Sequence, residues 1–235
     1  MHAMTTIMQP VRTNRHPRER RLTLSFDNGP HPDTTPRVIE ILKERGILSS
    51  FFAVGRQLAD CDNVALSRKA HENGHWLGNH TYSHRPALGE RYEANTAETE
   101  IAATQALLAD LAHPAKLFRP SGGGGNLDKR LLNPECLAYL QAHRYSCVLW
   151  TTVPGDLAGR DWVANALAAI EAQPWTLLVL HDVPGGAVPR LEEFLDAIEK
   201  RGQVEIMQSF PDTCVPMIQG WIRLPMDQYV RDEVA

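Results

Sequence analysis

Short apolar segments alternate with helical patterns along most of the chain. Seven segments have the length and composition of strands, at residues 22–26, 50–54, 75–78, 116–118, 145–150, 176–180 and 203–206. Most of the stretches between them carry helical periodicity. Alternation of strands with helices predicts a parallel sheet whose outer face is covered by helices.

Local signals mark the helix ends. One helix is predicted to begin at Thr35, with Pro36 at its first position, and to end at Gly46. A second ends at Gly74, and a last one is stopped by Gly202. The other predicted helices span about 93–111, 128–143 and 161–173, and the helix stopped by Gly202 spans about 191–201.

Seven such units favour a closed or nearly closed barrel over an open sheet. We expect an N-terminal arm at residues 1–20, a barrel at 21–206 and a C-terminal tail at 207–235 that packs on the barrel. No linker, repeat or low-complexity tract divides the barrel. In such a barrel, functional residues gather at the carboxyl ends of the strands.

Composition narrows the class of protein. The chain has 235 residues, 43% hydrophobic and 22% charged, with a net charge of −4. These values are typical of a soluble globular protein and argue against nucleic-acid or acidic-membrane partners. No apolar run reaches the roughly 18 residues of a membrane span, and the N-terminus lacks a signal-peptide pattern, so we expect a cytoplasmic protein. The four cysteines lie far apart without a C-x-x-C pattern, which predicts buried free thiols in place of a structural zinc site.

Polar residues follow the predicted strands. The first strand is followed by Asp27 and Asn28, the third by His80 and His84, and the fourth by Arg119. Trp150 and Asp156 follow the fifth strand, and His181 follows the sixth. In a parallel barrel all of these would lie at one rim.

Each of these residues also has a simpler interpretation. The spacing of His80 and His84 places two imidazoles on one face of a helical turn, which suits a metal, but His71 and His75 share that spacing among ten histidines. Asp27 could cap a turn, Arg119 could be a surface cation and His181 a core histidine. The four glycines at 122–125 lack the G-K-[ST] of a phosphate loop and indicate a turned loop.

In order, these segments resemble the polysaccharide deacetylase family, the NodB-homology domain of carbohydrate esterase family 4. The chain has S-F-D-N-G-P at 25–30 where the family has T-F-D-D-G-P, and H-T-Y-S-H at 80–84 for its H-[ST]-x-x-H. It has F-R-P-S at 118–121 for R-x-P, a tryptophan and then an aspartate in W-T-T-V-P-G-D at 150–156, and L-V-L-H-D at 178–182 for L-x-L-H-[DN]. The match spans about residues 22–202.

The resemblance implies a NodB-like fold, a distorted (β/α) barrel with seven or eight strands. It also implies that this barrel binds a divalent metal at its rim, usually zinc, nickel or cobalt, and removes an N-acetyl group from an amino sugar. By position it makes Asp27 the general base, oriented by Arg119, and His181 the general acid, with Asp156 as its partner. It makes His80, His84 and position 28 the metal ligands. It assigns Trp150, Leu180 and Tyr82 to substrate binding.

Asn28 departs from the family, which has an acid at this position. An amide oxygen can coordinate a metal but brings no charge, so we expect weaker metal binding and a preference for metals that favour nitrogen ligands. Asn28 could also mark a site without metal, or hydrogen-bond a substrate.

Three functions follow. The first is metal-dependent hydrolysis of a carbon–nitrogen amide bond in an N-acetylated sugar or related acyl amide. The second is metal-independent hydrolysis of a small cyclic amide or imide. The third is a carbohydrate-binding homologue without activity. Oligomeric state leaves no signal in the sequence.

Overall fold

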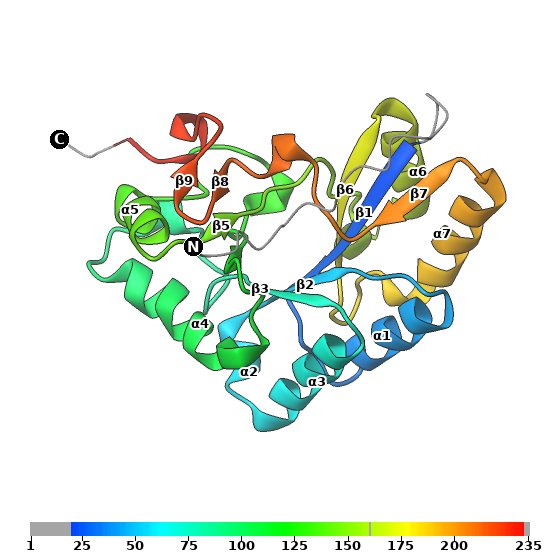
Figure 1. Ribbon diagram of the computed structural model, residues 1–235, viewed down its shortest axis with the longest axis horizontal. Coiled ribbons are helices and arrows are strands. Elements are labelled where there is room, and N and C mark those ends of the chain that lie inside the picture. Colours follow the sequence, from blue (N-terminus) through cyan, green and yellow to red (C-terminus); the bar gives the residue numbers. More distant parts are fainter. Residues whose placement is uncertain (1–19, 160, 233–235) are drawn as a thin grey trace, which may run out of the picture.

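The structure is a computed structural model that describes residues 20–159 and 161–232, so residues 1–19 of the predicted arm lie outside the described residues (Figure 1). One curled sheet organises this part of the chain. Its strands are β1 (Arg20–Asp27), β2 (Ser50–Ala53), β3 (Trp76–Asn79), β4 (Leu117–Phe118), β5 (Ser146–Cys147), β6 (Trp175–His181), β7 (Val204–Met207), β8 (Met217–Ile218) and β9 (Trp221–Ile222).

Strand β1 is the longest strand and pairs with β2, β6 and β7. The strand order is β6-β1-β2-β3-β4-β5-β8-β9, and all pairs from β6 to β5 are parallel. Strand β7 pairs with the first half of β1 and β2 with its last three residues. The segment after β5 returns to β6, because the N–H groups of Thr151 and Thr152 donate to the carbonyl of Leu177. The sheet therefore curls into an incomplete barrel.

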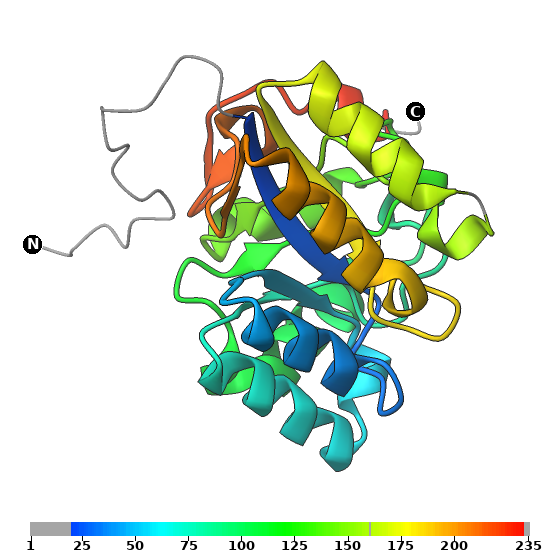
Figure 2. The ribbon, with the colours of Figure 1, turned by 90° about the vertical axis from the view of Figure 1, so that its right-hand side faces the viewer.

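Helices cover the outside of this sheet. They are α1 (Thr35–Glu44), α2 (Gly55–Leu58), α3 (Cys61–Glu72), α4 (Ala103–Leu108), α5 (Pro134–Ala142), α6 (Trp162–Ala172) and α7 (Val188–Arg201). In Figure 2, α7 and α1 lie next to each other on the side of the sheet that faces the viewer, with α6 above α7 and α3 below α1. Apolar residues of α1, α6 and α7 and of the central strands form the largest core cluster.

Side chains alternate between the two faces of β1, and one of these faces is polar. Leu22, Leu24 and Phe26 belong to the helix-facing core cluster. Successive side chains of a strand point to opposite faces, so Ser25 and Asp27 point into the barrel. A strand with apolar residues on one face thus delivers polar groups to the interior.

The sequence places most helices within one turn of their observed bounds. The helix predicted at 128–143 is an exception, since α5 begins at Pro134. Asn133 caps it, accepting a hydrogen bond at 2.8 Å from the Cys136 N–H, and Pro134 occupies the first position. Residues 128–132 form no helix, and the paired part of the strand predicted at 145–150 is only Ser146–Cys147.

The long helix predicted at 93–111 is present from residue 96, but it is not a regular α-helix. This region contains a π-helix at Glu98–Ala102, then α4, then a short 3₁₀ turn at Ala109–Leu111. A π-helical turn holds one residue more per turn than an α-helix, so it shifts every side chain after it around the axis. Glu100 lies in this turn, and its side chain contacts the loop that follows β3.

The segment after β7 adds to the barrel. Strand β8 pairs antiparallel with β5, and β8 and β9 form a hairpin. Phe210, Cys214 and Val215 join an apolar cluster with Phe52 and Leu117. No helix in residues 20–159 and 161–232 has the length and apolar character to span a bilayer. Of the four free cysteines, Cys61 is exposed, contrary to the prediction that all are buried.

Candidate active site

Asp27 ends β1 and is buried inside the barrel. Its Oδ1 accepts a hydrogen bond at 2.7 Å from Arg119 Nη1, which also donates to Ser25 Oγ at 2.8 Å. The Arg119 guanidinium has no exposed surface and lies over the Phe52 ring at 3.9 Å. Further hydrogen bonds to the Val148 and Leu149 carbonyls fix its plane. Arg119 is therefore a buried, fully oriented partner of Asp27, and its interpretation as a surface cation is wrong.

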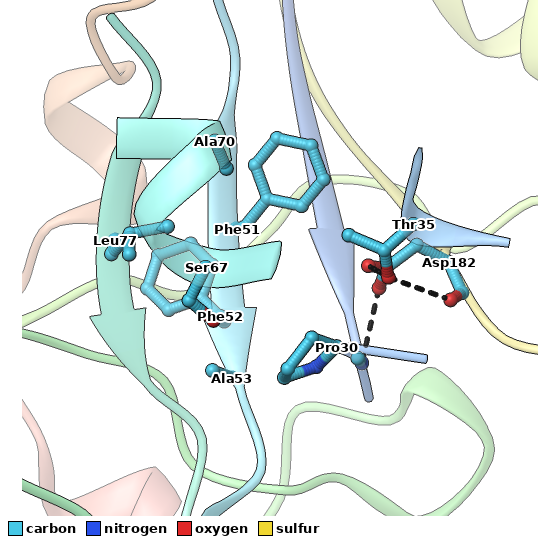
Figure 3. A pocket seen from close by; sticks show the side chains of 10 residues that line it. Pro30, Thr35, Phe51, Phe52, Ala53, Ser67, Ala70, Leu77 and Asp182 are labelled. Carbon is cyan, nitrogen blue, oxygen red and sulfur yellow. Dashed lines mark hydrogen bonds between the residues drawn. The ribbon is translucent and has the colours of Figure 1, made fainter. Parts of the chain in front are cut away.

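The turn after Asp27 is held by a second acid, Asp182. Its Oδ1 accepts the Gly29 N–H at 3.0 Å and its Oδ2 accepts the Thr35 hydroxyl at 2.5 Å (Figure 3). A Cβ on Gly29 would lie 2.2 Å from the Asp182 carboxylate, so this position requires glycine. Burial raises the pKa of Asp182 to about 6.

A small cavity lies behind this turn. It measures about 10 Å³ and is lined by Pro30, Phe51, Phe52, Leu77 and Asp182 among others (Figure 3). That volume is close to the minimum for one water molecule. Its walls are mostly apolar, so it is a packing gap and has no room for a sugar.

His80 and His84 lie in a loop after β3. The prediction that they share a helical turn was wrong, because residues 80–84 form no helix and Thr81 and His84 have left-handed backbones, with φ of 66° and 68°. The irregular loop still brings the two imidazoles together, with ring centroids 5.2 Å apart. The pair at His71 and His75 divides between α3 and the start of β3, where buried His75 accepts the Ser49 N–H.

Hydrogen bonding determines which nitrogen of His80 is free. Nδ1 lies 2.9 Å from the Arg119 carbonyl, which can only accept, so Nδ1 carries the proton. Nε2 then holds a lone pair 3.6 Å from Asp27 Oδ2. Burial lowers the pKa of His80, and burial together with His80 lowers the pKa of His84 to about 3. Both imidazoles are neutral, the form that binds metals.

His181 ends β6 and is held by Asp156. Its Nδ1–H donates to Asp156 Oδ1 at 2.8 Å, and its backbone N–H donates to Oδ2 at 2.8 Å. Burial by itself lowers the pKa of His181, but the hydrogen bond and charge of Asp156 and the charges of Asp27 and Asp182 outweigh it, so the pKa is raised. The imidazole is 14% exposed, which leaves Nε2 accessible from the rim.

The strand register places Asp27 close to His181. Asp27 and His181 are direct partners in the parallel pairing of β1 with β6. Asp27 and His181 both contribute to the electrostatic environment of His80 and His84. Groups from residues 27, 80, 84, 119 and 181 therefore lie close to one another at the carboxyl ends of the strands.

The three residues predicted to bind substrate have different surroundings. Trp150 is buried beside the glycine loop, and its indole N–H donates to the Gly125 carbonyl at 2.8 Å. Tyr82 is half-buried, and its ring lies against Gly55. Leu180 has no exposed surface and belongs to the helix-facing core, on the opposite face of β6 from His181. The structure does not bring Leu180 to the site.

The residue before Leu180 takes the inward position. Val179 shares its face of β6 with His181 and belongs to the same apolar cluster as Trp150. Period-2 counting back from His181 would have identified it in the sequence. Glu100 and Asp182 were also missed as supports of the site. Glu100 follows Ala97 and precedes Thr104 at helical spacing on a buried face, which was its one signal.

The residues at the rim fit a divalent metal. Asn28 has a left-handed backbone, with φ of 79°, and its Oδ1 is buried with no hydrogen-bond partner among the described residues. An unpaired buried amide oxygen and two neutral imidazoles together offer two nitrogens and one oxygen, a donor set that suits zinc, cobalt or nickel. A separate group at Asp60, Cys61 and Asp62 is exposed, and Asp60 there caps α3.

Comparison with known proteins identifies the family. The family model for polysaccharide deacetylase matches residues 14–141. The chitooligosaccharide deacetylase of Azorhizobium caulinodans is 30% identical over 165 residues, which cover 68% of this chain and 72% of that protein. A peptidoglycan-N-acetylglucosamine deacetylase of Bacillus cereus is 30% identical over 182 residues, 76% of this chain and 61% of that one. This chain belongs to the polysaccharide deacetylase family, and the predicted resemblance is confirmed.

Solved structures show the same fold. A peptidoglycan N-acetylglucosamine deacetylase bound to a hydroxamate aligns with a TM-score of 0.66 at 24% identity, covering 81% of this chain and 88% of that one. A family 4 acetyl xylan esterase of Clostridium thermocellum, solved with cobalt, aligns with a TM-score of 0.64 at 23% identity, covering 80% and 88%. The predicted NodB-like barrel is confirmed as a mixed α/β fold with a curled, half-barrel sheet.

The family context also bears on the chemistry. The two relatives found by sequence are named as deacetylases, hydrolases of carbon–nitrogen bonds other than peptide bonds, so the predicted enzyme class is confirmed at the level of the family. The family generally depends on a divalent metal. One structural neighbour, at a TM-score of 0.65 and 17% identity, is a mutant of a pseudoenzyme of this family, so the fold alone does not establish activity.

Proposed function

We propose that this chain is a metal-dependent deacetylase that removes the acetyl group from an N-acetylated amino sugar or its oligomer. The observation that carries the proposal is that two ionisable side chains with different hydrogen-bond partners lie opposite each other on one pair of strands. Asp27 is bound and oriented by Arg119, and His181 is held by Asp156 with a raised pKa. This is the division between base and acid that amide hydrolysis needs.

Asp27 acts as the general base through Oδ2. Arg119 occupies Oδ1, which leaves Oδ2 facing the histidine pair. As a water oxygen attacks the acyl carbon, Oδ2 accepts the water proton. Arg119 fixes the direction of the Asp27 carboxyl group, so its benefit to the rate is geometric.

His181 acts as the general acid through Nε2. Because Nδ1–H is bound to Asp156, the remaining nitrogen faces the rim and carries the transferable proton. When the carbon–nitrogen bond breaks, Nε2 gives this proton to the departing amine nitrogen. The products are acetate and a free amino sugar, which balances the water and the amide consumed.

The metal would be held by Asn28 Oδ1, His80 Nε2 and His84. When bound, zinc, cobalt or nickel supplies Lewis acidity that polarises the acyl carbonyl. Asn28 adds no negative charge to this set, so affinity is lower than with a carboxylate and the ion keeps more of its positive charge. Asn28 Oδ1 lacks another partner, which supports this role.

Val179 and Trp150 form the apolar wall nearest the acid. Both belong to one cluster, and Val179 lies two residues before His181 on the same face of β6. We assign the acyl methyl group to this wall, in place of Leu180.

Acetate release from N-acetylglucosamine oligomers tests the proposal. The protein is stripped with a chelator, then assayed with zinc or cobalt added back. We expect activity to disappear on stripping, to return with metal and to be lost in His80→Ala. His71→Ala is the matched control, because His71 is exposed on α3. Equal activity in His80→Ala and His71→Ala would contradict metal dependence.

Asn28 itself favours a second candidate, hydrolysis of a small cyclic amide or imide without metal. The base Asp27 and the acid His181 suffice for that reaction in principle. Turnover of a cyclic imide in the presence of chelator, abolished by His181→Ala, would establish it. Glycan binding without turnover of either substrate class would instead favour the binding homologue.

A further inference from the structure

Glu100 is a buried carboxylate outside every motif considered above, yet it contacts the loop that carries both histidines. It lies in the π-helix Glu98–Ala102 and is 4% exposed. Its Oε2 accepts the backbone N–H groups of Tyr82 at 3.0 Å and Ser83 at 2.9 Å, and its Oε1 accepts the Ser83 hydroxyl at 2.8 Å. Hydrogen bonds to a charged acceptor are stronger than neutral ones, so the centre of the loop is fixed to this helix.

The start of the loop is tied to the same π-helix. Asn79, directly before His80, donates from Nδ2 to the Ile101 carbonyl at 2.8 Å and accepts the Thr81 N–H at 3.0 Å through Oδ1. His80 is thus bracketed by attachments at residue 79 and at residues 82–83. The position of its imidazole depends on both.

The loop conformation needs such support. Thr81 and His84 have left-handed backbones, which are unfavourable for residues with a branched or bulky side chain. Conformations of this kind persist where surrounding contacts over-determine them. Among the described contacts of the loop, the Glu100 carboxylate accepts two consecutive amides between these two residues.

Arg91 balances the charge of Glu100. Its Nη2 lies 2.9 Å from Glu100 Oε1 and donates to Ser83 Oγ at 2.5 Å and to the Arg85 carbonyl. A buried carboxylate needs such a partner, and this one extends the attachment past His84 to residue 85. The backbone of Arg91 in turn accepts a hydrogen bond from Arg231 at 2.8 Å.

We propose that Glu100, together with Arg91, is a positioning residue that holds His80 and His84 in the arrangement that binds the divalent metal. This inference rests on the proposed function, since it gives the histidine loop its purpose. Glu100 touches neither reacting group, because its carboxylate is taken by the loop and by Arg91. Its effect passes entirely through the placement of the imidazoles.

Titration of the stripped protein with Co²⁺ tests this inference. We expect Glu100→Ala to raise the Kd for Co²⁺ by about 10- to 100-fold, the usual effect of losing a residue that orients metal ligands. The visible absorption of bound Co²⁺ should change as well, because the ligand geometry changes. Activity at saturating Co²⁺ should recover most of the wild-type value. Glu98→Ala is the control, because Glu98 is exposed on the same π-helix.

Each possible result of the Co²⁺ titration either supports or overturns this inference. Wild-type Kd and spectrum in a folded Glu100→Ala protein overturn the inference and leave the proposed function standing. Absence of Co²⁺ binding in the wild type overturns the metal-dependent function and this inference with it. Should Glu100→Ala fail to fold, Glu100→Gln decides, since it keeps the shape and one oxygen. A folded Glu100→Gln with an intermediate Kd supports positioning, and one with the wild-type Kd limits Glu100 to stability.

Discussion

The two halves of the candidate site are held in place by different means. Asp27 and His181 are the last residues of adjacent parallel strands and sit directly opposite each other in the register. His80 and His84 lie in an irregular loop whose position depends on side-chain contacts, above all those of Glu100 and Asn79. The backbone ladder fixes the acid and base, whereas a polar network fixes the proposed metal ligands.

This difference has a consequence for function. A position set by a strand ladder resists single substitutions, because many backbone hydrogen bonds determine it together. A loop held by a few side chains can be loosened by one change. We therefore expect acid and base variants to lose chemistry while keeping metal, and loop variants to lose metal while keeping the acid and base.

The largest effect should come from the strand-held pair. We expect Asp27→Asn or His181→Ala to lower kcat by about 10²- to 10⁴-fold, the range for loss of a general acid or base. Co²⁺ affinity in His181→Ala should stay close to wild type, because His181 is not among the proposed ligands. Steady-state kinetics and Co²⁺ titration of the same samples check both halves. A His181→Ala protein that keeps full activity contradicts the assigned acid.

His80→Ala should show the opposite pattern. We expect its Kd for Co²⁺ to rise by more than the roughly 10- to 100-fold typical of losing a supporting residue, because a ligand itself is removed. Melting temperature should fall by about 2–4 °C or more, since His80 is buried and its hydrogen bond to the Arg119 carbonyl is lost. Calorimetry with Co²⁺ and a thermal melt measure the two quantities, and unchanged affinity would reassign the ligands.

The substitution Asn28→Asp tests whether residue 28 is a metal ligand. A carboxylate adds a negative charge to the ligand set, so we expect metal affinity to rise by about tenfold or more, equivalent to about 1.4 kcal/mol. Titration with Zn²⁺ and Co²⁺ checks this expectation. If affinity is the same or lower, Asn28 Oδ1 does not face the metal, and a role in substrate binding becomes the better interpretation.

The smallest effect concerns pH. Asp156 raises the pKa of His181, and a general acid works only while protonated, so activity falls as pH rises through that pKa. Asp156→Asn removes the charge and lowers the pKa of His181. The alkaline limb of the kcat/KM profile should therefore move to lower pH, while the acid limb, which belongs to the base, stays in place. An unmoved alkaline limb would assign it to another group.

The sequence by itself determined the family and the α/β barrel, and it predicted the positions of the proposed acid, base and histidine ligands. It could do so because the polar residues follow apolar strand patterns, and parallel strands gather their carboxyl ends at one rim. It also predicted most helix ends from caps such as Pro36 and Gly202, since these signals act within one turn.

Only the tertiary structure decided how the parts meet. The pairing of Asp27 with His181, the free Nε2 of His80 and the outward direction of Leu180 depend on strand register and on partners distant in sequence. The π-helix that carries Glu100 was hidden for the same reason, because local helical periodicity cannot reveal one inserted residue. Contacts between segments tens of residues apart fixed those features, and no local pattern encodes them.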